Sequence, residues 1–209
     1  MFGEWLRLLW RRIVNDAPQL RQRVAQIDGG ELTEIASAYP YSDVFPSARP
    51  SAVVYTTKND AASRLFASED FELPVGMVAR YGLPQDEDMA GIASIICDFP
   101  VYFLGDCDPF DLLVYAWLRQ HLSIRFLGTS DAVVAALGVD VNDRITIPLP
   151  KEEQRAMSLV REVWPEFANS VGPNLARLLD SNRKLELEAL VSFHTNPISN
   201  LLHLLRGTA

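Results

Sequence analysis

The sequence predicts an α/β domain with a parallel sheet of about four strands and further helices at both ends of the chain. Short apolar runs alternate with helical patterns from residue 52 onwards, and this order is typical of parallel sheets with right-handed crossovers. The four apolar residues 101–104 have the pattern of a strand that is buried on both faces. The chain has 209 residues, of which 48% are apolar, so it is long enough for one large domain.

Strands are expected where short apolar runs end at glycine or at a turn. The third run ends at Gly105 and the fourth at Gly128, and Pro84 marks the turn after the second run. The expected strands are residues 52–56, 74–79, 101–104 and 124–127, with a short extended segment at 144–149.

Helices are expected where apolar residues recur at helical spacing between such breaks. Pro109 suits the first position of a helix, and Gly138 and Gly207 are placed to end helices. The expected helices are residues 59–66, 86–96, a helix that begins at Pro109, and 129–137, 151–163, 173–179, 183–193 and 197–206.

The N-terminal region predicts a basic amphipathic helix over residues 2–14. Leu6, Leu9, Trp10 and Ile13 share one face of this helix. Residues 1–27 hold five arginines against two acids, and a second helix is expected over residues 18–27. Such a helix can dock on its own domain, on a partner or on a membrane surface. We expect it to dock on the α/β domain through these four side chains, with a homodimer contact as the alternative.

Three prolines within residues 39–51 predict a linker between the N-terminal helices and the α/β domain. The expected organisation is therefore 1–50 for the N-terminal helices and linker, 51–193 for the α/β domain, and 194–209 for a C-terminal helix.

Composition argues against several classes of protein. The net charge of −8 is unlike that of a protein that coats nucleic acid without sequence preference. The two cysteines, Cys97 and Cys107, suggest neither a disulfide framework nor a zinc site, which favours the cytoplasm. Neither a membrane span nor a signal peptide is expected, because no apolar run is long enough and arginines interrupt the apolar N-terminus.

Three aspartates lie on the turn that follows the third expected strand. Asp106 stands at the strand end, Asp108 precedes Pro109, and Asp111 falls in the first turn of the helix. Asp108 is a natural N-cap and Asp111 is placed like the acidic partner of a capping box, which needs no function. Helix capping does not explain Asp106. Paired carboxylates at a strand end also suit Mg²⁺, and open α/β sheets bind ligands at this edge.

Five segments carry a resemblance to a known family. They are residues 55–65, Gly82-Leu-Pro84, residues 100–112 with their Asp-Cys-Asp-Pro turn, residues 125–128 and residues 183–190. In this order they resemble the Toprim domain of the topoisomerase VI A subunit and of its meiotic double-strand-break relatives. The resemblance implies a Rossmann-like fold in which a glutamate after the first strand and an Asp-x-Asp after a later strand bind Mg²⁺. It assigns metal-ligand positions to Asp106 and Asp108.

Two positions depart from the family's pattern. The family's metal-binding glutamate falls on Thr57, and the glycine after the aromatic residue becomes Asp111. The first 50 residues are also expected to be too few for the family's winged-helix domain with its nucleophilic tyrosine. Neither Tyr39 nor Tyr41 is expected to act as that nucleophile.

Two functions follow as hypotheses. The favoured one is a degenerate, stand-alone Toprim-like module that binds a nucleic acid or a protein or has a structural role, without catalysis and with weak or absent Mg²⁺ binding. The alternative is a Mg²⁺-dependent nuclease or phosphotransferase in which Asp106, Asp108 and Asp111 hold the metal. In that case Lys58 or Arg80 would contact phosphate. Both hypotheses predict that the first and third strands are neighbours, with Thr57 beside Asp106 at their carboxyl ends.

Overall fold

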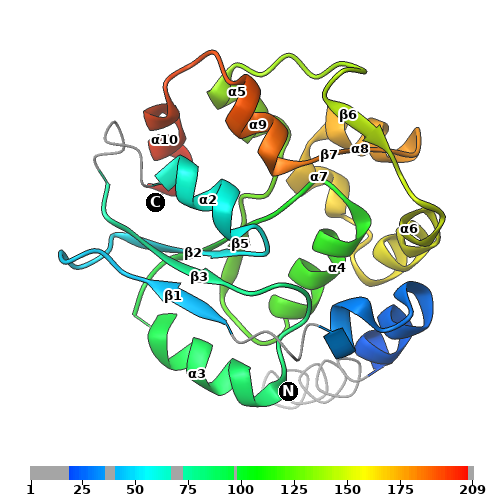
Figure 1. The fold of residues 1–209 in the computed structure, drawn as a ribbon, viewed down its shortest axis with the longest axis horizontal. Helices are drawn as coiled ribbons and strands as arrows, with labels where there is room; N and C mark the ends of the chain where they lie inside the picture. Colours follow the sequence, from blue (N-terminus) through cyan, green and yellow to red (C-terminus); the bar gives the residue numbers. More distant parts are fainter. Residues whose placement is uncertain (1–18, 36–40, 67–72, 97, 207–209) are drawn as a thin grey trace, which may run out of the picture.

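The computed structural model of the protein describes residues 19–35, 41–66, 73–96 and 98–206. The predicted amphipathic helix with Trp5 and Trp10, together with Tyr39 and Cys97, lies outside these residues. The described chain is an α/β fold with a five-stranded, mostly parallel central sheet flanked by helices (Figure 1). The predicted fold class is therefore confirmed.

Four strands form the parallel part of the sheet: β2 (Ala52–Thr56), β3 (Val75–Ala79), β4 (Val101–Leu104) and β5 (Ile124–Phe126). The order across the sheet is β1-β3-β2-β4-β5. The chain thus adds β3 on one side of β2 and β4 on the other. This reversal creates a topological switch point between β2 and β4, the place where open α/β sheets bind ligands.

Strand β1 (Ser42–Val44) lies at the edge of the sheet and pairs antiparallel with β3. The assignment of residues 39–51 to a linker was wrong at this point. Pro40 and Pro46 flank the strand in the sequence and do not interrupt it. An edge strand tolerates such prolines because one side of its backbone has no partner strand.

Helices cover both faces of the sheet. The first four after β2 are α2 (Asn59–Phe66), α3 (Asp86–Ile96), α4 (Pro109–Leu118) and α5 (Asp131–Leu137). Figure 1 shows α3 and α4 on one side of the sheet and α2 on the other. Successive residues of β4 face opposite sides of the sheet. The Phe103 ring packs on Tyr115 of α4, with 5.5 Å between ring centroids. The Tyr102 hydroxyl donates to the carbonyl of Leu205, at 2.7 Å, near the C-terminus.

The remaining chain is mostly helical and includes a small second sheet. Its helices are α6 (Lys151–Val163), α7 (Phe167–Val171), α8 (Pro173–Asp180), α9 (Leu187–Phe193), the 3₁₀ turn η3 (Ile198–Leu201) and α10 (Leu202–Leu205). Strands β6 (Thr146–Pro148) and β7 (Arg183–Leu185) pair antiparallel. The single helix expected over residues 183–193 was wrong at its start, because the first three residues pair with β6. The short helix α7 was not predicted.

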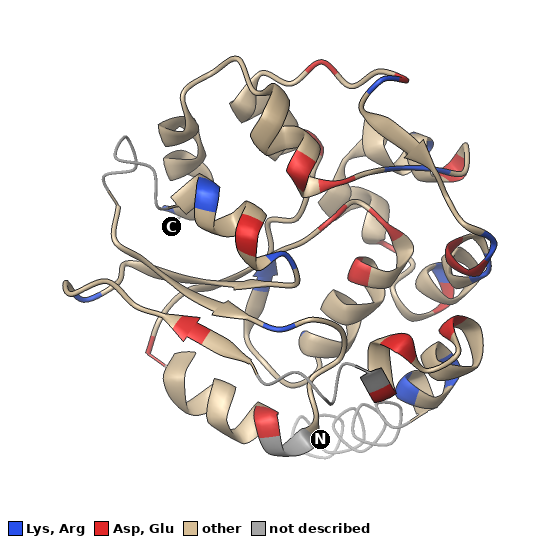
Figure 2. Cartoon of the chain, viewed as in Figure 1, with Lys and Arg blue, Asp and Glu red and all other residues tan. Residues whose placement is uncertain are grey.

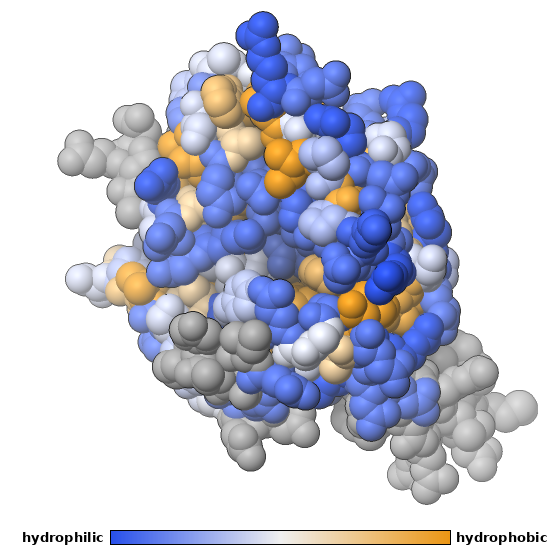
Figure 3. Space-filling view, turned by 45° about the vertical axis from the view of Figure 1, so that its right-hand side comes forward, coloured by the Kyte–Doolittle hydropathy of each residue, from blue (hydrophilic) through white to orange (hydrophobic). Residues whose placement is uncertain are grey.

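One apolar core runs through the described residues, from Leu20 in the helix of residues 19–28 to Leu205. That helix leads into the short η1 (Glu31–Ile35). Figure 3 shows one face of the molecule, where hydrophilic residues cover most of the surface and apolar residues form small, separate groups. Among the described helices, none has both the length and the apolar character needed to cross a membrane.

Candidate functional site

The candidate site lies at the carboxyl ends of β2 and β4, which are paired in parallel. Thr57 and Lys58 follow β2, and Asp106 follows β4 after one glycine. The hydroxyl of Thr57 and the backbone N–H of Asp106 both donate to Oδ2 of Asp111, at 2.8 and 2.6 Å. The two residues are thus neighbours at the switch point, as the order of the sequence segments predicts.

The capping explanation holds for one of the three aspartates. Oδ1 of Asp108 accepts from the backbone N–H of Asp111 at 2.8 Å, so Asp108 is the N-cap of α4. The side chain of Asp111 does not complete a capping box, since its Oδ2 accepts from Asp106 and Thr57 instead. Gly105 makes room for this arrangement, because a Cβ atom there would lie 2.5 Å from Oδ2 of Asp111.

Asp106 joins three parts of the chain. Its Oδ2 lies 2.6 Å from the Nζ atom of Lys58, and its Oδ1 accepts from the backbone N–H of Leu187 at 2.8 Å. Leu187 is the first residue of α9, so the carboxylate fixes the start of that helix over the sheet edge. Cys107 strengthens this cover, since its backbone bonds with that of Leu185 in both directions, at 2.9 and 3.4 Å.

The three aspartates form a compact carboxylate cluster, defined here as Asp106, Asp108 and Asp111. One oxygen of each lies within 4.8 Å of the others, and all three residues are at most 7% exposed. Figure 2 shows acidic positions on the turn that leads into α4. Carboxylate oxygens at this spacing could hold one metal ion.

A second ion pair, which the sequence did not reveal, borders the cluster. Nζ of Lys184 in β7 lies 2.7 Å from Oε1 of Glu153 in α6, and 3.8 Å from Oδ2 of Asp108. Both Lys184 and Glu153 are buried. The cluster therefore has two lysines within ion-pair distance, Lys58 on one side and Lys184 on the other.

Arg80, the other predicted phosphate contact, is buried and faces away from solvent. Its side chain is 1% exposed, and Nη2 lies 3.1 Å from Oδ2 of Asp88 in α3. Its Nε and Nη1 have no hydrogen-bond partner in the part of the chain that the structure describes. Arg80 follows β3 and its backbone N–H donates to the carbonyl of Thr56, so it lies at the same sheet edge as the cluster.

Burial raises the pKa of every aspartate in the cluster. Burial and the neighbouring Asp108 raise the pKa of Asp106 to about 7, against the opposing effect of Lys58. Burial and Glu153 raise the pKa of Asp108, while burial and Asp108 raise that of Asp111 well above its usual range. Burial disfavours the Lys58 ammonium, but the Asp106 carboxylate outweighs it and raises the pKa of Lys58. The cluster therefore holds protons more tightly than free aspartates do.

We expect the protein to be more stable at pH 5 than at pH 8. The pKa of such an aspartate is higher in the folded protein than its value of about 3.9 in the unfolded chain. Its contribution to stability is complete at a pH below the unfolded pKa, and it is lost as the pH rises through the folded pKa. For Asp106, with a folded pKa of about 7, the loss falls between about pH 4 and pH 7. Urea unfolding across this range measures it, with a slope of at most about 1.4 kcal/mol per pH unit for each proton.

The control for this pH effect is Asp111→Asn, which keeps an acceptor oxygen but removes one acid. The remaining aspartates then repel each other less and ionise more readily, so the slope between pH 5 and pH 8 should become shallower. An unchanged slope in the variant would assign the pH dependence to groups outside the cluster.

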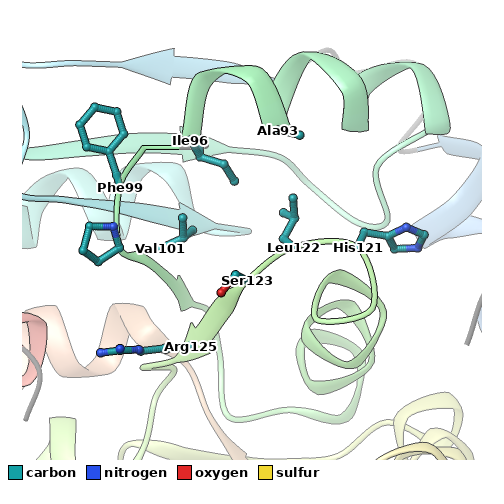
Figure 4. A pocket seen from close by; sticks show the side chains of 9 residues that line it. Ala93, Ile96, Phe99, Val101, His121, Leu122, Ser123 and Arg125 are labelled. Atoms are coloured by element: carbon teal, nitrogen blue, oxygen red, sulfur yellow. The ribbon is translucent and has the colours of Figure 1, made fainter. Parts of the chain in front are cut away.

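A separate hollow of about 450 Å³ lies at the amino ends of β4 and β5, opposite the cluster. Figure 4 shows its lining, which includes the apolar side chains of Ile96, Phe99 and Leu122 and the polar ones of His121 and Arg125. Because it opens at the other end of the strands, it is not part of the carboxylate site.

Comparison with protein-family models and with curated proteins gave no match to this chain.

Proposed function

We propose that the chain is a Toprim-like module that does not cleave nucleic acid and instead acts as a binding or structural part. The resemblance of its segments to that family motivates the proposal, and two features of the fold are consistent with it. The sheet is parallel around β2 and β4, and Asp106 and Asp108 follow β4 at the switch point. These are the positions that the resemblance assigns to metal ligands.

The observation that carries the proposal is the closure of the cluster by the chain itself. Asp106 is 0% exposed, and the backbone N–H of Leu187 is bonded to it. Metal-assisted transfer of a phosphoryl group needs a metal ion that contacts both the protein and the substrate phosphate. With β7 and α9 over the carboxylates, a substrate has no direct approach to them.

The cluster also suits a hydrated Mg²⁺ poorly. Mg²⁺ keeps several waters and requires nearly ideal octahedral geometry. Oδ2 of Asp106 is ion-paired with Lys58, Oδ1 of Asp106 accepts from Leu187, and Oδ2 of Asp111 accepts two hydrogen bonds. At Thr57, where the family places a glutamate, this chain has a neutral hydroxyl. We therefore assign no catalytic step to a metal in this site.

The two predicted phosphate contacts support the same conclusion. Lys58 is paired with Asp106, and Arg80 is buried beside Asp88. The charged groups of both residues are thus engaged by carboxylates of the chain itself, which leaves neither free for a phosphate. These two residues therefore give no support for a nucleic acid backbone as the ligand of this edge.

We expect the purified protein to leave single- and double-stranded DNA and RNA intact in Mg²⁺ or Mn²⁺. Gel assays with end-labelled substrates measure this, and Asp106→Asn is the matched control, because the substitution removes one carboxylate and keeps its shape. Cleavage that requires a divalent ion and is lost in Asp106→Asn would contradict the proposal. Cleavage that persists in the variant would indicate a contaminating nuclease.

One observation favours a second candidate, the Mg²⁺-dependent nuclease or phosphotransferase. The three carboxylates lie within 4.8 Å of one another, and Asp111 lies beside Thr57, where the family's glutamate would stand. In this alternative Asp111 takes the place of the missing glutamate, and β7 with α9 must move away to admit substrate. The cleavage assay above decides between the two.

A further inference from the structure

The contact between Lys58 and Asp106 brings a positive charge into the carboxylate cluster from the chain itself. Nζ of Lys58 lies 2.6 Å from Oδ2 of Asp106. The aspartate side chain is 0% exposed and the lysine side chain is 29% exposed. The two groups are therefore in direct contact as a close ion pair. The lysine therefore extends from the surface into the cluster and ends on a buried carboxylate.

The position of Lys58 in the chain shows how strongly the cluster attracts it. The carbonyl of Lys58 accepts the first hydrogen bond of α2, from the N–H of Ala62 at 2.9 Å, which places Lys58 at the start of that helix. Helix N-termini favour anions and disfavour cations. The hydroxyl of Thr56 fixes this turn by accepting from the backbone N–H of Lys58 at 2.9 Å. Attraction to the carboxylates must therefore outweigh the helix dipole.

A divalent ion would compete with Lys58 for the same oxygen. Mg²⁺ and Mn²⁺ bind carboxylate oxygens directly. At Asp106, Oδ2 faces the ammonium group, and Oδ1 is bonded to the backbone of Leu187. An ion shared by the three aspartates would have to displace the lysine, and it would be repelled by the lysine's charge at close range.

We infer that Lys58 is the resident cation of the carboxylate cluster and that it keeps divalent ions out. The lysine supplies one of the charges that three buried carboxylates need, and Lys184 supplies a second from the side of Asp108. This inference deepens the proposed function and rests on it in one respect, since both hold that the native cluster binds no Mg²⁺.

The variant Lys58→Ala tests the inference. It removes the ammonium group and opens the partly exposed path that the side chain fills. Mn²⁺ is the probe, and binding to the full chain is followed by calorimetry and by the electron paramagnetic resonance signal of free Mn²⁺. We expect the variant to bind one Mn²⁺ at least about tenfold more tightly than the wild type does. Its thermal midpoint should rise with Mn²⁺, whereas that of the wild type should not.

Three further variants separate the charge of Lys58 from other effects. Lys58→Arg keeps a cation at the site and should gain no Mn²⁺ binding. Lys151→Met removes an exposed lysine at the start of α6 and should behave as the wild type. The double variant Lys58→Ala/Asp106→Asn loses a ligand together with the cation, so the Mn²⁺ binding gained by Lys58→Ala should be lost again.

Folding of Lys58→Ala is itself informative, because the variant leaves Asp106 without its partner. If the variant is unfolded in the presence of a chelator, Mn²⁺ should restore its circular dichroism spectrum at one ion per chain. Equal Mn²⁺ affinity in the wild type and in Lys58→Ala would overturn the inference. So would a variant that folds but binds no Mn²⁺, or one that Mn²⁺ fails to refold.

Failure of this inference differs from failure of the proposed function. Wild-type chain that binds Mn²⁺ as tightly as Lys58→Ala, yet cleaves no nucleic acid, contradicts the role of Lys58 and leaves the proposed absence of cleavage intact. Cleavage by the wild type in Mn²⁺, lost in Asp106→Asn, contradicts the proposed function whatever the affinities are.

Discussion

Replacing Lys184 by methionine is expected to lower the free energy of unfolding by about 3 to 5 kcal/mol, the range found when one partner of a buried ion pair is removed. Lys184 is 9% exposed, and its Nζ atom lies 2.7 Å from Oε1 of Glu153, which is 7% exposed. The same atom is 3.8 Å from Oδ2 of Asp108. Methionine fills a similar volume but leaves two buried carboxylates without this charge. Equilibrium unfolding in urea measures the change.

Two controls show whether the loss comes from uncompensated charge. Lys184→Met/Glu153→Leu removes both partners and should recover much of the stability, because an apolar pair of similar volume costs little in a buried site. Lys151→Met changes an exposed lysine and should stay within about 0.5 kcal/mol of the wild type. A Lys184→Met variant as stable as Lys151→Met would mean that solvent reaches Glu153 and Asp108 freely.

The parallel strands of the central sheet could be predicted because each has a local apolar pattern in the sequence. The run 101–104 is apolar at every position, and in β4 all four residues are buried. Pro109 and the N-cap Asp108 then mark the start of α4 without reference to the rest of the fold. β1 was missed because three exposed residues between prolines have no apolar pattern, and only the neighbouring β3 makes them a strand.

The cluster could be predicted only in part, for a related reason. Sequence order placed Thr57 and Asp106 on adjacent strand ends, and the structure brings both to Asp111. The hydrogen bond from Leu187 to Asp106 joins positions that are 81 residues apart, and no local sequence pattern predicts it. Lys184 was missed because three residues of β7 are too few to show strand alternation, so the segment was taken as helix.

The contacts of Asp111 give it a structural role that does not require a metal. Its Oδ2 accepts from the backbone N–H of Asp106 and from the hydroxyl of Thr57. Both donors lie at the switch point, just beyond the paired ends of β2 and β4. Burial and Asp108 raise the pKa of Asp111 well above its usual range, so the group that accepts these bonds need not carry a full charge.

Asp111→Leu is therefore expected to lower the free energy of unfolding by about 2 to 5 kcal/mol, while Asp111→Asn should stay within about 1 kcal/mol of the wild type at pH 8. Leucine leaves two donors without an acceptor in a site where the residue is 6% exposed. Asparagine keeps an acceptor oxygen in the same place and relieves repulsion from Asp106 and Asp108. Urea unfolding of both variants at pH 8 measures the difference.

The pair of variants also separates the two candidate functions. If Asp111 acts through its hydrogen bonds, only the leucine variant is impaired, and adding Mn²⁺ changes neither variant relative to the wild type. If Asp111 completes a metal site in place of the family's glutamate, the asparagine variant must lose Mn²⁺ affinity that the wild type has, because an amide oxygen is a weaker ligand for a hard cation than a carboxylate. A stable Asp111→Asn protein with lost Mn²⁺ binding would thus support the nuclease, whereas a stable variant indistinguishable from wild type in Mn²⁺ supports a cluster held together by lysines and backbone donors.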